Sequence, residues 1–460
     1  MLPMSDCAER LREILGPEKV SNDPVVLAEH SGDKWFAATV PEVVVFAMET
    51  ADVTAVMRFA TEHRIPVTPR GSGYGYVGGC VPVKRGIVLS LARMNRILEI
   101  HFADGVAVVQ PGVITGELQS NVRAQGLYYP PDPASLKECS IGGNIATNAG
   151  GPRCLKYGVT RSYLLGLEVV LPNGDVIRAG GRTHKNKTGF DLIGLFTGSE
   201  GMLGVVTEAT LRLLPLPPAR ASLSASFASA TAAAAAVQAV FRAGFLPAAL
   251  EVADAFTLEA ARKHLGRGLV PDGQAHLLID LDGQPGSVNG ESAELHSILQ
   301  QSGALSVLTA VGEEECEKLW DLRRGFSFSL RATGLIKLNE DIVVPRGRLV
   351  ELFAFGAQLQ EKYGFPVACF GHAGDGNIHV NIMCPDYEKP EVRERAEVAL
   401  DELFTQVLAW GGVITGEHGV GLAKKRWWPQ AVSENTDELH RILKNALDPL
   451  GILNPGKFLD

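Results

Sequence analysis

Apolar and polar positions along the first half of the chain predict short strands and a few helices. An apolar strand that begins at Val43 leads to a helix that is capped at Thr50–Asp52 and ends near His63. Further strands are predicted over five apolar segments, which are Ile65–Thr68, Gly86–Leu91, Val106–Val109, Leu165–Leu171 and Val205–Leu214. Turns rich in Gly and Pro separate these segments, which favours an α+β domain over a doubly wound sheet.

A run of prolines marks the boundary between two predicted domains. The residues Leu214-Pro215-Leu216-Pro217-Pro218 end the preceding strand and stiffen the backbone. We therefore predict one domain over residues 1–217 and a second over 218–460. In the second domain, strands are predicted over Ala221–Phe227, His276–Leu281, Ser306–Ala310, Phe365–Gly371 and Asn377–Met383. Helices are predicted over Thr231–Ala243, Gly290–Gln301, Glu313–Leu330 and Pro390–Trp410.

Composition adds limits on the class of protein. At 460 residues the chain exceeds the roughly 250–300 residues at which one hydrophobic core stops growing, so two cores are expected. The net charge of -9 argues against nucleic acid as the main partner, because binding to a polyanion needs clustered Lys and Arg. No apolar run reaches membrane-spanning length, and Met1–Arg12 lacks the pattern of a secretory signal.

The cysteines indicate a reducing compartment. Seven are spread along the chain, an odd number without a C-x-x-C pair, which fits the cytoplasm best. The same scatter provides no framework for an iron–sulfur cluster. Any electrons collected by this protein must therefore pass to another molecule or to oxygen.

Three glycine-rich segments carry the first chemical signal. The segment Pro69–Gly79 contains G-x-G-x-x-G at Gly73, Gly75 and Gly78, but it continues as a loop and does not open a helix. We therefore reject a Rossmann unit that binds NAD. The bare amides favour an anion nest, with Arg70 adding charge for a pyrophosphate, and a plain surface turn is the alternative. The segments Ser140–Gly151 and Thr197–Glu208 repeat this composition, which favours one large shared ligand.

These segments resemble a known family. The strings PRGSGYGYVGG, YYPPDPAS, SIGGNIATNAGG, KTGFDL and GSEGMLGVVTE are similar to the FAD-binding domain (PCMH type) of the vanillyl-alcohol oxidase superfamily. The strings KLNEDIVVPR, GHAGDGNIHVN, GEHGVGLAK and GILNPGKF resemble its branch that contains glycolate oxidase, D-lactate dehydrogenase and D-2-hydroxyglutarate dehydrogenase. The resemblance implies an FAD domain of two subdomains and an α+β cap domain over the isoalloxazine.

The resemblance also implies which residues hold FAD. They are Arg70, Gly71, Ser72, Gly73, Tyr74, Gly75, Pro131, Asp132, Gly142, Gly143, Asn144, Thr147, Gly201, Val206 and, from the C-terminus, Asn454. Some relatives attach FAD through His or Cys near these loops. Because Tyr74 and Tyr76 stand in the first loop here, we expect noncovalent FAD, although Cys80 lies just beyond it.

Histidines in the second half suggest a metal site. Two imidazoles, His372 and His379, with the carboxylate of Glu417, suit Zn²⁺ or another divalent ion, although a paired loop histidine is the commoner case. The resemblance assigns these three residues as metal ligands and His418 as the catalytic base. Asp375, before Gly376, favours a turn role.

A carboxylate substrate needs a cation with planar donors. Arg323 and Arg324 lie on a predicted helix, where neighbouring positions point apart, so at most one of them should face the pocket while the other is solvated. The resemblance favours Arg323 and adds Lys337, for which an ordinary strand-edge lysine is the alternative. Asn381 should lie on the same strand face as His379.

Together these features predict FAD-dependent oxidation of a small D-2-hydroxy acid to the 2-oxo acid. The electron acceptor would be an electron-transfer flavoprotein, a quinone or an iron–sulfur protein, and a homodimer is one open arrangement. Two alternatives remain: an FAD enzyme for a phenol, alcohol or ether-lipid precursor, and a non-catalytic subunit that relays electrons.

Overall fold

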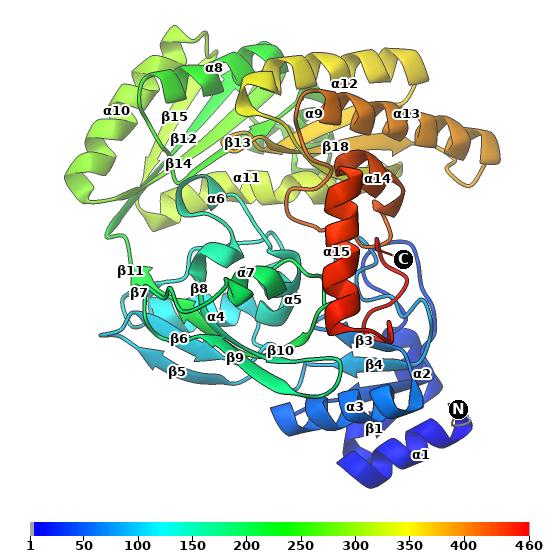
Figure 1. Cartoon of the computed structure of the whole chain (residues 1–460). Coiled ribbons are helices and arrows are strands. Elements are labelled where there is room, and N and C mark those ends of the chain that lie inside the picture. The colour runs from blue at the N-terminus through cyan, green and yellow to red at the C-terminus, as the bar shows by residue number, and fades with distance from the viewer. Residues whose placement is uncertain (1–3, 460) are drawn as a thin grey trace. The chain divides into compact units, whose positions relative to one another are not determined.

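The computed structural model describes residues 4–459, and the contacts within it divide the chain into two units (Figure 1). Of the described residues, unit 1 contains 4–150, 159–216 and 417–459, and unit 2 contains 151–158 and 217–416. The chain thus leaves unit 1 twice and returns to it twice. Of the segment Met1–Arg12, residues 1–3 lie outside the described part, and helix α1 covers Met4–Leu15.

Unit 1 opens with a four-stranded sheet in the order β1-β2-β4-β3. Its elements are β1 (Val20–Ser21), α2 (Pro24–Glu29), β2 (Val43–Phe46), α3 (Thr50–His63), β3 (Val67–Arg70) and β4 (Ile87–Ser90). The strands β2 and β3 both pair with β4 in parallel, and α1 and α3 pack with them in one apolar core. Because β3 ends at Arg70, the first glycine segment begins where this strand ends.

The second sheet of unit 1 has five antiparallel strands in the order β5-β6-β10-β8-β9. These are β5 (Ile97–His101), β6 (Val106–Val109), β8 (Leu164–Val170), β9 (Val176–Gly180) and β10 (Val205–Arg212). Helices α4 (Thr115–Arg123), α5 (Ile141–Thr147) and α7 (Leu192–Phe196) and the short pair β7 (Leu127–Tyr128) and β11 (Leu214–Pro215) complete this part. The other glycine segments lead into α5 and β10.

The last segment of the chain also belongs to unit 1. It carries α14 (Trp428–Ala431) and α15 (Glu434–Leu447). The buried ammonium of Lys444 lies 2.6 Å from Asp448 and also donates to the carbonyls of Met202 and Leu453. Beyond it the backbone runs beside β3, where Val67 donates to Ile452 and accepts from Asn454. The C-terminus is thus fixed next to the strand that leads into the first glycine segment.

Unit 2 is built on one seven-stranded sheet in the order β15-β12-β14-β13-β17-β18-β16. Its strands are β12 (Ala219–Phe227), β13 (Ala249–Ala253), β14 (Ala275–Gly283), β15 (Ser306–Val311), β16 (Ile336–Val343), β17 (Val367–His372) and β18 (Asn377–Cys384). Its longer helices are α8 (Ala230–Arg242), α9 (Ala255–Leu265), α10 (Pro285–Gln301), α11 (Glu313–Arg331), α12 (Leu349–Tyr363) and α13 (Pro390–Ala409). All of its strand pairs are antiparallel.

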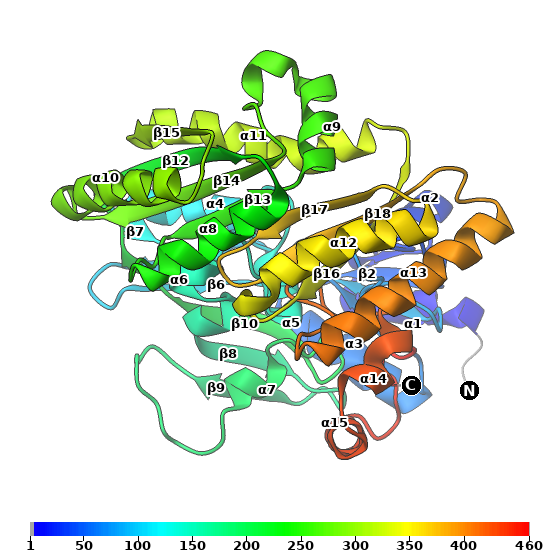
Figure 2. The same ribbon diagram turned by 90° about the horizontal axis from the view of Figure 1, so that it is seen from above.

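The two faces of this sheet differ in polarity. One face carries apolar side chains such as Val367 and Cys369, which pack near Gly356 of α12, and α8, α12 and α13 lie side by side along it (Figure 2). On the other face α9 and α11 cover a smaller apolar cluster around Phe370. Paired residues of antiparallel strands point to the same face, so the register places Glu251, His372 and His379 on this second face. The candidate residues of unit 2 therefore share one side of one sheet.

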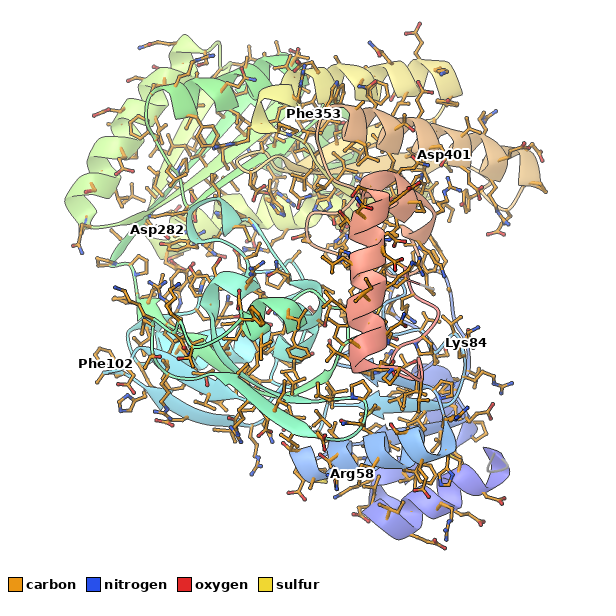
Figure 3. All side chains as sticks on the ribbon, viewed as in Figure 1. Arg58, Lys84, Phe102, Asp282, Phe353 and Asp401 are labelled. Atoms are coloured by element: carbon orange, nitrogen blue, oxygen red, sulfur yellow. The ribbon has the colours of Figure 1, made fainter. Side chains whose placement is uncertain are left out.

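Residues 151–158 enter unit 2 between two segments of unit 1 and form α6 (Cys154–Tyr157). Asp282, which is labelled in Figure 3, lies at the end of β14. Its carboxylate accepts from Lys156 at 2.5 Å and from the hydroxyl of Tyr157 at 2.8 Å. Leu155 packs against Gly374, where a Cβ atom would lie 2.4 Å from its side chain. This segment thus supports the turn between β17 and β18.

The predicted α+β class is confirmed, and most of the predicted elements occur within a few residues of their expected bounds. The helix predicted over Thr231–Ala243 is α8. Among the elements that the sequence did not reveal are β13, α9 and α12 of unit 2. Of these, β13 matters most, because it carries Glu251. Within residues 4–459, no helix combines the length and apolar character needed to cross a lipid bilayer.

Candidate active site

The three glycine segments, far apart in the sequence, meet in unit 1. Gly71 lies against Ser140, and a Cβ atom on Gly71 would be 2.4 Å from the Ser140 hydroxyl oxygen. The third segment joins the second through backbone bonds, from Gly198 to the carbonyl of Ile145 and from Glu200 to that of Ala146. The structure therefore brings together the loops that composition alone suggested were parts of one binding site.

Close packing explains why these positions are glycine. A Cβ atom on Gly142 would lie 2.6 Å from the side chain of Pro111, and one on Gly73 would lie 2.0 Å from the guanidinium of Arg70. Gly73 also has a positive φ of 71°, which side chains of L-residues rarely adopt. At these glycine positions the loops present bare backbone, which fits a large flat ligand with a diphosphate.

Arg70 supports the first loop from within. Its guanidinium donates to the carbonyls of Gly32 and Glu29 and, at 3.2 Å, to the sulfur of Cys80. Burial raises the pKa of the Cys80 thiol to about 11. The thiolate form is therefore scarce near neutral pH, which makes Cys80 a poor nucleophile. Direct contact of Arg70 with a pyrophosphate stays a prediction.

Other predicted cofactor residues surround the same loops. Asn454 donates its amide to the carbonyls of Gly79 and Glu200, at 3.0 and 2.8 Å, and so joins the first loop to the third. The carbonyl of Pro131 accepts from Gln119 at 2.8 Å, and the Asn144 amide donates to the Thr115 hydroxyl at 2.6 Å.

His418 lies beside the first glycine loop, within unit 1. Its ring centroid is 5.2 Å from that of Tyr76. The loop that carries it is held by Glu200, a buried carboxylate that accepts from the backbone N–H groups of Val420 and Gly421 at 2.7 and 2.8 Å. Burial raises the pKa of Glu200, and these two hydrogen bonds oppose that change. Nothing in the sequence marked Glu200 as the residue that positions this loop.

The two histidines of the predicted metal set lie on neighbouring strands of unit 2. His372 ends β17, His379 lies on β18, and their ring centroids are 5.7 Å apart. Nδ1 of His372 lies 2.7 Å from the Glu251 carboxylate. A carboxylate at one imidazole nitrogen orients the other toward a metal, a common arrangement in metal sites. Charge and hydrogen bonds from His372 and Arg323 lower the pKa of Glu251 to about 2, against the opposing effect of burial.

Glu417, the third residue of the predicted metal set, follows a segment that is hydrogen-bonded to this sheet. The buried carboxylate of Asp341 on β16 accepts from the Thr415 hydroxyl at 2.8 Å and the Gly416 N–H at 3.0 Å. Glu417 is joined to Gly416 by one peptide bond. His372, His379 and Glu417 each offer a ligand atom, and these atoms lie within 4.8 Å of one another. Two imidazoles and a carboxylate fit a divalent first-row ion.

The two predicted arginines differ as their helix positions require. The side chain of Arg323 is 12% exposed, whereas that of Arg324 is 51% exposed and pairs with Glu317 and Asp321. Arg323 bonds to Glu251 at 2.6 Å and lies over the ring of Phe370, 5.0 Å from its centroid. The buried arginine is thus tied to the carboxylate that also contacts His372.

Lys337 and Asn381 lie on the same face of the sheet. The Lys337 ammonium donates to the Ser327 hydroxyl at 2.9 Å, and burial lowers its pKa to about 8, with a smaller effect from Arg331. Asn381 is fully buried and donates its amide to the carbonyls of Ala368 and His379. Its Oδ1 has no hydrogen-bond partner within residues 4–459. Asp375 has the expected turn role and accepts from the N–H of Asn377.

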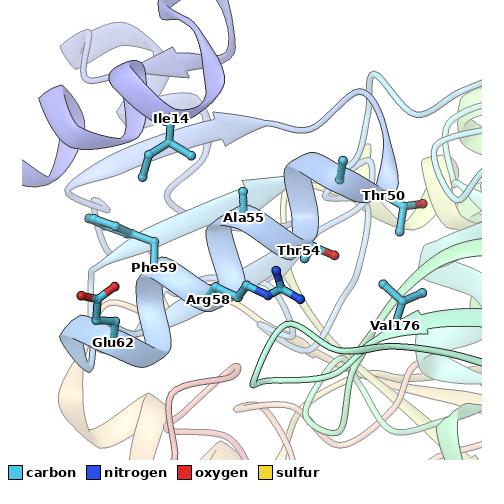
Figure 4. A pocket seen from close by; sticks show the side chains of 9 residues that line it. Ile14, Thr50, Thr54, Ala55, Arg58, Phe59, Glu62 and Val176 are labelled. Carbon is cyan, nitrogen blue, oxygen red and sulfur yellow. The ribbon is translucent and has the colours of Figure 1, made fainter.

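A surface hollow of about 520 Å³ lies elsewhere in unit 1 (Figure 4). Side chains of α3, including Thr54, Arg58 and Phe59, line it together with Ile14 and Val176. None of its lining residues belongs to the glycine segments or to the histidine set. This hollow is therefore separate from the predicted cofactor and metal residues.

Unit 1 has two sheets and three glycine segments that come together, and unit 2 has a helix-covered antiparallel sheet with a histidine pair. This combination defines a two-domain flavoprotein oxidoreductase. Residues 41–180 match the FAD binding domain family, and residues 216–458 match the family of FAD linked oxidases, C-terminal domain. The chain belongs to the FAD-linked oxidase family.

Curated relatives match over nearly the full chain. The glycolate oxidase subunit GlcD of Bacillus subtilis (strain 168) is 40% identical over 98% of this chain and 96% of its own. The D-lactate dehydrogenase of Anaerostipes hadrus is 34% identical, with the same two coverages of 98% and 96%. Among solved structures, p-cresol methylhydroxylase with substrate bound superposes with a TM-score of 0.80 at 22% identity, covering 99% of this chain and 96% of that chain. At that identity the likeness concerns the fold.

Proposed function

We propose that this protein oxidises a small D-2-hydroxy acid to the corresponding 2-oxo acid and passes the electrons to an external acceptor. One observation carries the proposal. A candidate metal ligand, His372, and a candidate anchor for a carboxylate, Arg323, both bond to Glu251. The hydroxyl and carboxylate ends of a 2-hydroxy acid also lie only a few atoms apart, so neighbouring groups could hold them.

Each group of residues would have a distinct role in the reaction. Arg323 and Lys337 would bind the substrate carboxylate, and Asn381 would offer its Oδ1 as an acceptor. His372, His379 and Glu417 would hold a divalent ion, Zn²⁺ being the leading candidate, which would lower the pKa of the substrate hydroxyl. His418 would accept the hydroxyl proton. FAD, when bound, supplies the acceptor for the hydride from the substrate Cα.

FAD would be held by the predicted set around the three glycine segments, which runs from Arg70 to Gly75 and includes Gly142, Gly143 and Asn454. The tight packing at Gly71 and Gly142 supports this assignment. The raised pKa of Cys80 supports noncovalent attachment. Seven free cysteines fit a reducing compartment, and we propose the cytoplasm as the location.

The relatives favour a hydroxy acid over the rival substrates. Their names refer to glycolate and D-lactate, at 34–40% identity over nearly the full chain. An FAD enzyme for a phenol or a lipid precursor would need neither the histidine pair nor the buried Arg323. A subunit that only relays electrons would need no base at the position of His418.

The test of the function is anaerobic reduction of the bound flavin. Purified protein saturated with FAD is mixed with D- and L-2-hydroxy acids such as lactate, glycolate and 2-hydroxyglutarate, and flavin absorbance is followed. We expect bleaching with at least one D-2-hydroxy acid or with glycolate, and little with the L-enantiomers. Full retention of the flavin absorbance with every acid would rule out the proposal.

The pKa of Lys337 predicts a pH dependence of substrate binding. Because that pKa is about 8, KM for the acid should be constant below pH 8 and rise about tenfold per pH unit above it, as the ammonium loses its proton. The variant Lys337→Met should have a higher KM at pH 7 without this rise. Steady-state kinetics between pH 6 and 10 measures both profiles, and identical slopes in the two proteins would contradict the role of Lys337.

The lowered pKa of Lys337 also makes the stability of the fold depend on pH, and here a rise in pH is favourable. Between pH 8 and 10.5, the ordinary pKa of lysine, the unfolded chain binds more protons at Lys337 than the folded chain does. The contribution of this residue to stability should therefore improve as pH rises through that window.

A further inference from the structure

One carboxylate in unit 2 lies between two residues with different proposed tasks. Glu251 is at the centre of β13 and is fully buried. One of its oxygens contacts Nδ1 of His372 at 2.7 Å. The other accepts from Nε of Arg323 and lies within 2.6 Å of a terminal nitrogen of the same guanidinium. Both oxygens are therefore used, each by a different neighbour.

The sheet register forces this arrangement. Glu251 pairs directly with His372, so the two side chains leave adjacent strands on the same face. Arg323 reaches Glu251 from helix α11, which covers that face, and its guanidinium lies over Phe370 of β17. Phe370 in turn packs beside His379, with ring centroids 5.4 Å apart. The Glu251 carboxylate is thus held between His372 of the neighbouring strand and Arg323 of the covering helix.

We infer that Glu251 is a positioning residue that fixes both His372 and Arg323, and so sets the distance between the metal end and the carboxylate end of the substrate site. Glu251 itself would touch neither metal nor substrate. Its contact with Nδ1 leaves Nε2 of His372 as the ligand atom, and its two contacts with Arg323 leave the other terminal nitrogen of the guanidinium for a substrate anion. The inference rests on the proposed function for the tasks of these two neighbours.

A second buried carboxylate supplies a matched control. Asp280 on β14 lies on the same face of the sheet and is fully buried. It also binds arginine, at 3.0 Å from Nε of Arg220 and 3.1 Å from Arg153, and it accepts from Trp320. These partners are separate from the neighbours of Glu251. Asp280→Asn therefore disturbs a buried ion pair of the same sheet without touching the proposed metal or substrate residues.

The first measurement is the affinity for Zn²⁺ alone. Metal-free protein, purified with its FAD, is titrated with Zn²⁺ against a chromophoric chelator. We expect Glu251→Gln to weaken Zn²⁺ binding by about 10- to 100-fold, as for other residues that orient metal ligands. Asp280→Asn should change the Zn²⁺ affinity by less than about 3-fold, even if its melting temperature falls. This variant loses a buried ion pair, as Glu251→Gln does, but it keeps the contact that orients His372.

The second measurement separates the two tasks of Glu251. Saturating Zn²⁺ should restore kcat of Glu251→Gln but not its raised KM, because Arg323 stays unanchored. Arg323→Lys, which keeps the charge beside Glu251, should retain Zn²⁺ affinity within about 3-fold while KM rises. A Glu251→Gln variant with wild-type Zn²⁺ affinity and wild-type KM would overturn the inference.

Two further measurements cover the case in which Glu251→Gln does not fold. Glu251→Asp is one methylene shorter and can keep at most one of the two contacts, so it should lose Zn²⁺ affinity, substrate affinity or both. Normal values for both would refute the inference. In wild-type protein labelled with ¹⁵N-histidine, His372 should carry a slowly exchanging proton on Nδ1 after Zn²⁺ is added, and a deprotonated Nδ1 would also refute it. Absence of flavin reduction by hydroxy acids in wild-type protein would reject the proposed function, while the Zn²⁺ and NMR results would still test Glu251.

Discussion

Replacement of His418 by alanine is expected to lower the rate of flavin reduction by substrate about 10²- to 10⁴-fold, the usual loss when a general base is removed. The reason is its place beside Tyr76 of the first glycine loop, together with its position next to Glu417 in the chain. Stopped-flow absorbance of the flavin under anaerobic conditions measures the rate. FAD content should stay near one per chain, because the glycine segments proposed to hold FAD are unchanged.

A histidine of the same unit that contacts none of the glycine segments provides the control. His440 lies on α15, is half-buried against the ring of Trp428, and contacts the carbonyl of Thr436. His440→Ala should reduce flavin at the wild-type rate. If substrate reduced the flavin of His418→Ala as fast as that of the wild-type protein, His418 would not be the catalytic base. That result would favour the alternative of a subunit that only relays electrons.

Loss of the proposed divalent metal is expected to have the second of the two largest effects. Dialysis against a strong chelator, or His379→Ala, should lower kcat/KM for the hydroxy acid about 10³-fold, because a metal stabilises developing negative charge by several kcal/mol and each 1.36 kcal/mol changes a rate about tenfold. Zn²⁺ or Mn²⁺ should restore the dialysed wild-type protein but not the variant. Elemental analysis of both proteins measures the bound metal directly.

Another buried histidine of the sheet controls for simple loss of packing. His276 lies on β14, bonds to Ser224 at 2.8 Å and packs near Phe326, and burial lowers its pKa to about 4. It is not part of the group that could hold a metal. His276→Ala should lower the melting temperature and leave metal content unchanged. Activity of the chelated enzyme with hydroxy acids at the original rate would instead favour the rival class of substrates.

Much of the fold could be predicted from local patterns. The apolar run Val106–Val109, the alternating segment Asn377–Met383 and the helix near Glu313–Leu330 occur close to their expected bounds. The strand β13 was missed because its residues Ala-Leu-Glu-Val-Ala form no alternating pattern. This strand is buried on both faces and is apolar apart from Glu251, whose contacts come from distant parts of the chain.

The sequence by itself determined the kinds of group available: glycine segments able to hold a flat diphosphate ligand, two histidines on a short hairpin, and one arginine of a pair turned inward. Those signals are local, since they depend on residue type and on spacing within a few positions. The tertiary structure alone decided which distant groups support them. Glu251 meets His372 across 121 positions of the chain and Glu200 meets Val420 across 220. Strand register brings Glu251 to His372, and loop packing brings Glu200 to Val420. No local sequence pattern predicts these contacts, because register and loop packing depend on side chains from separate segments being buried together.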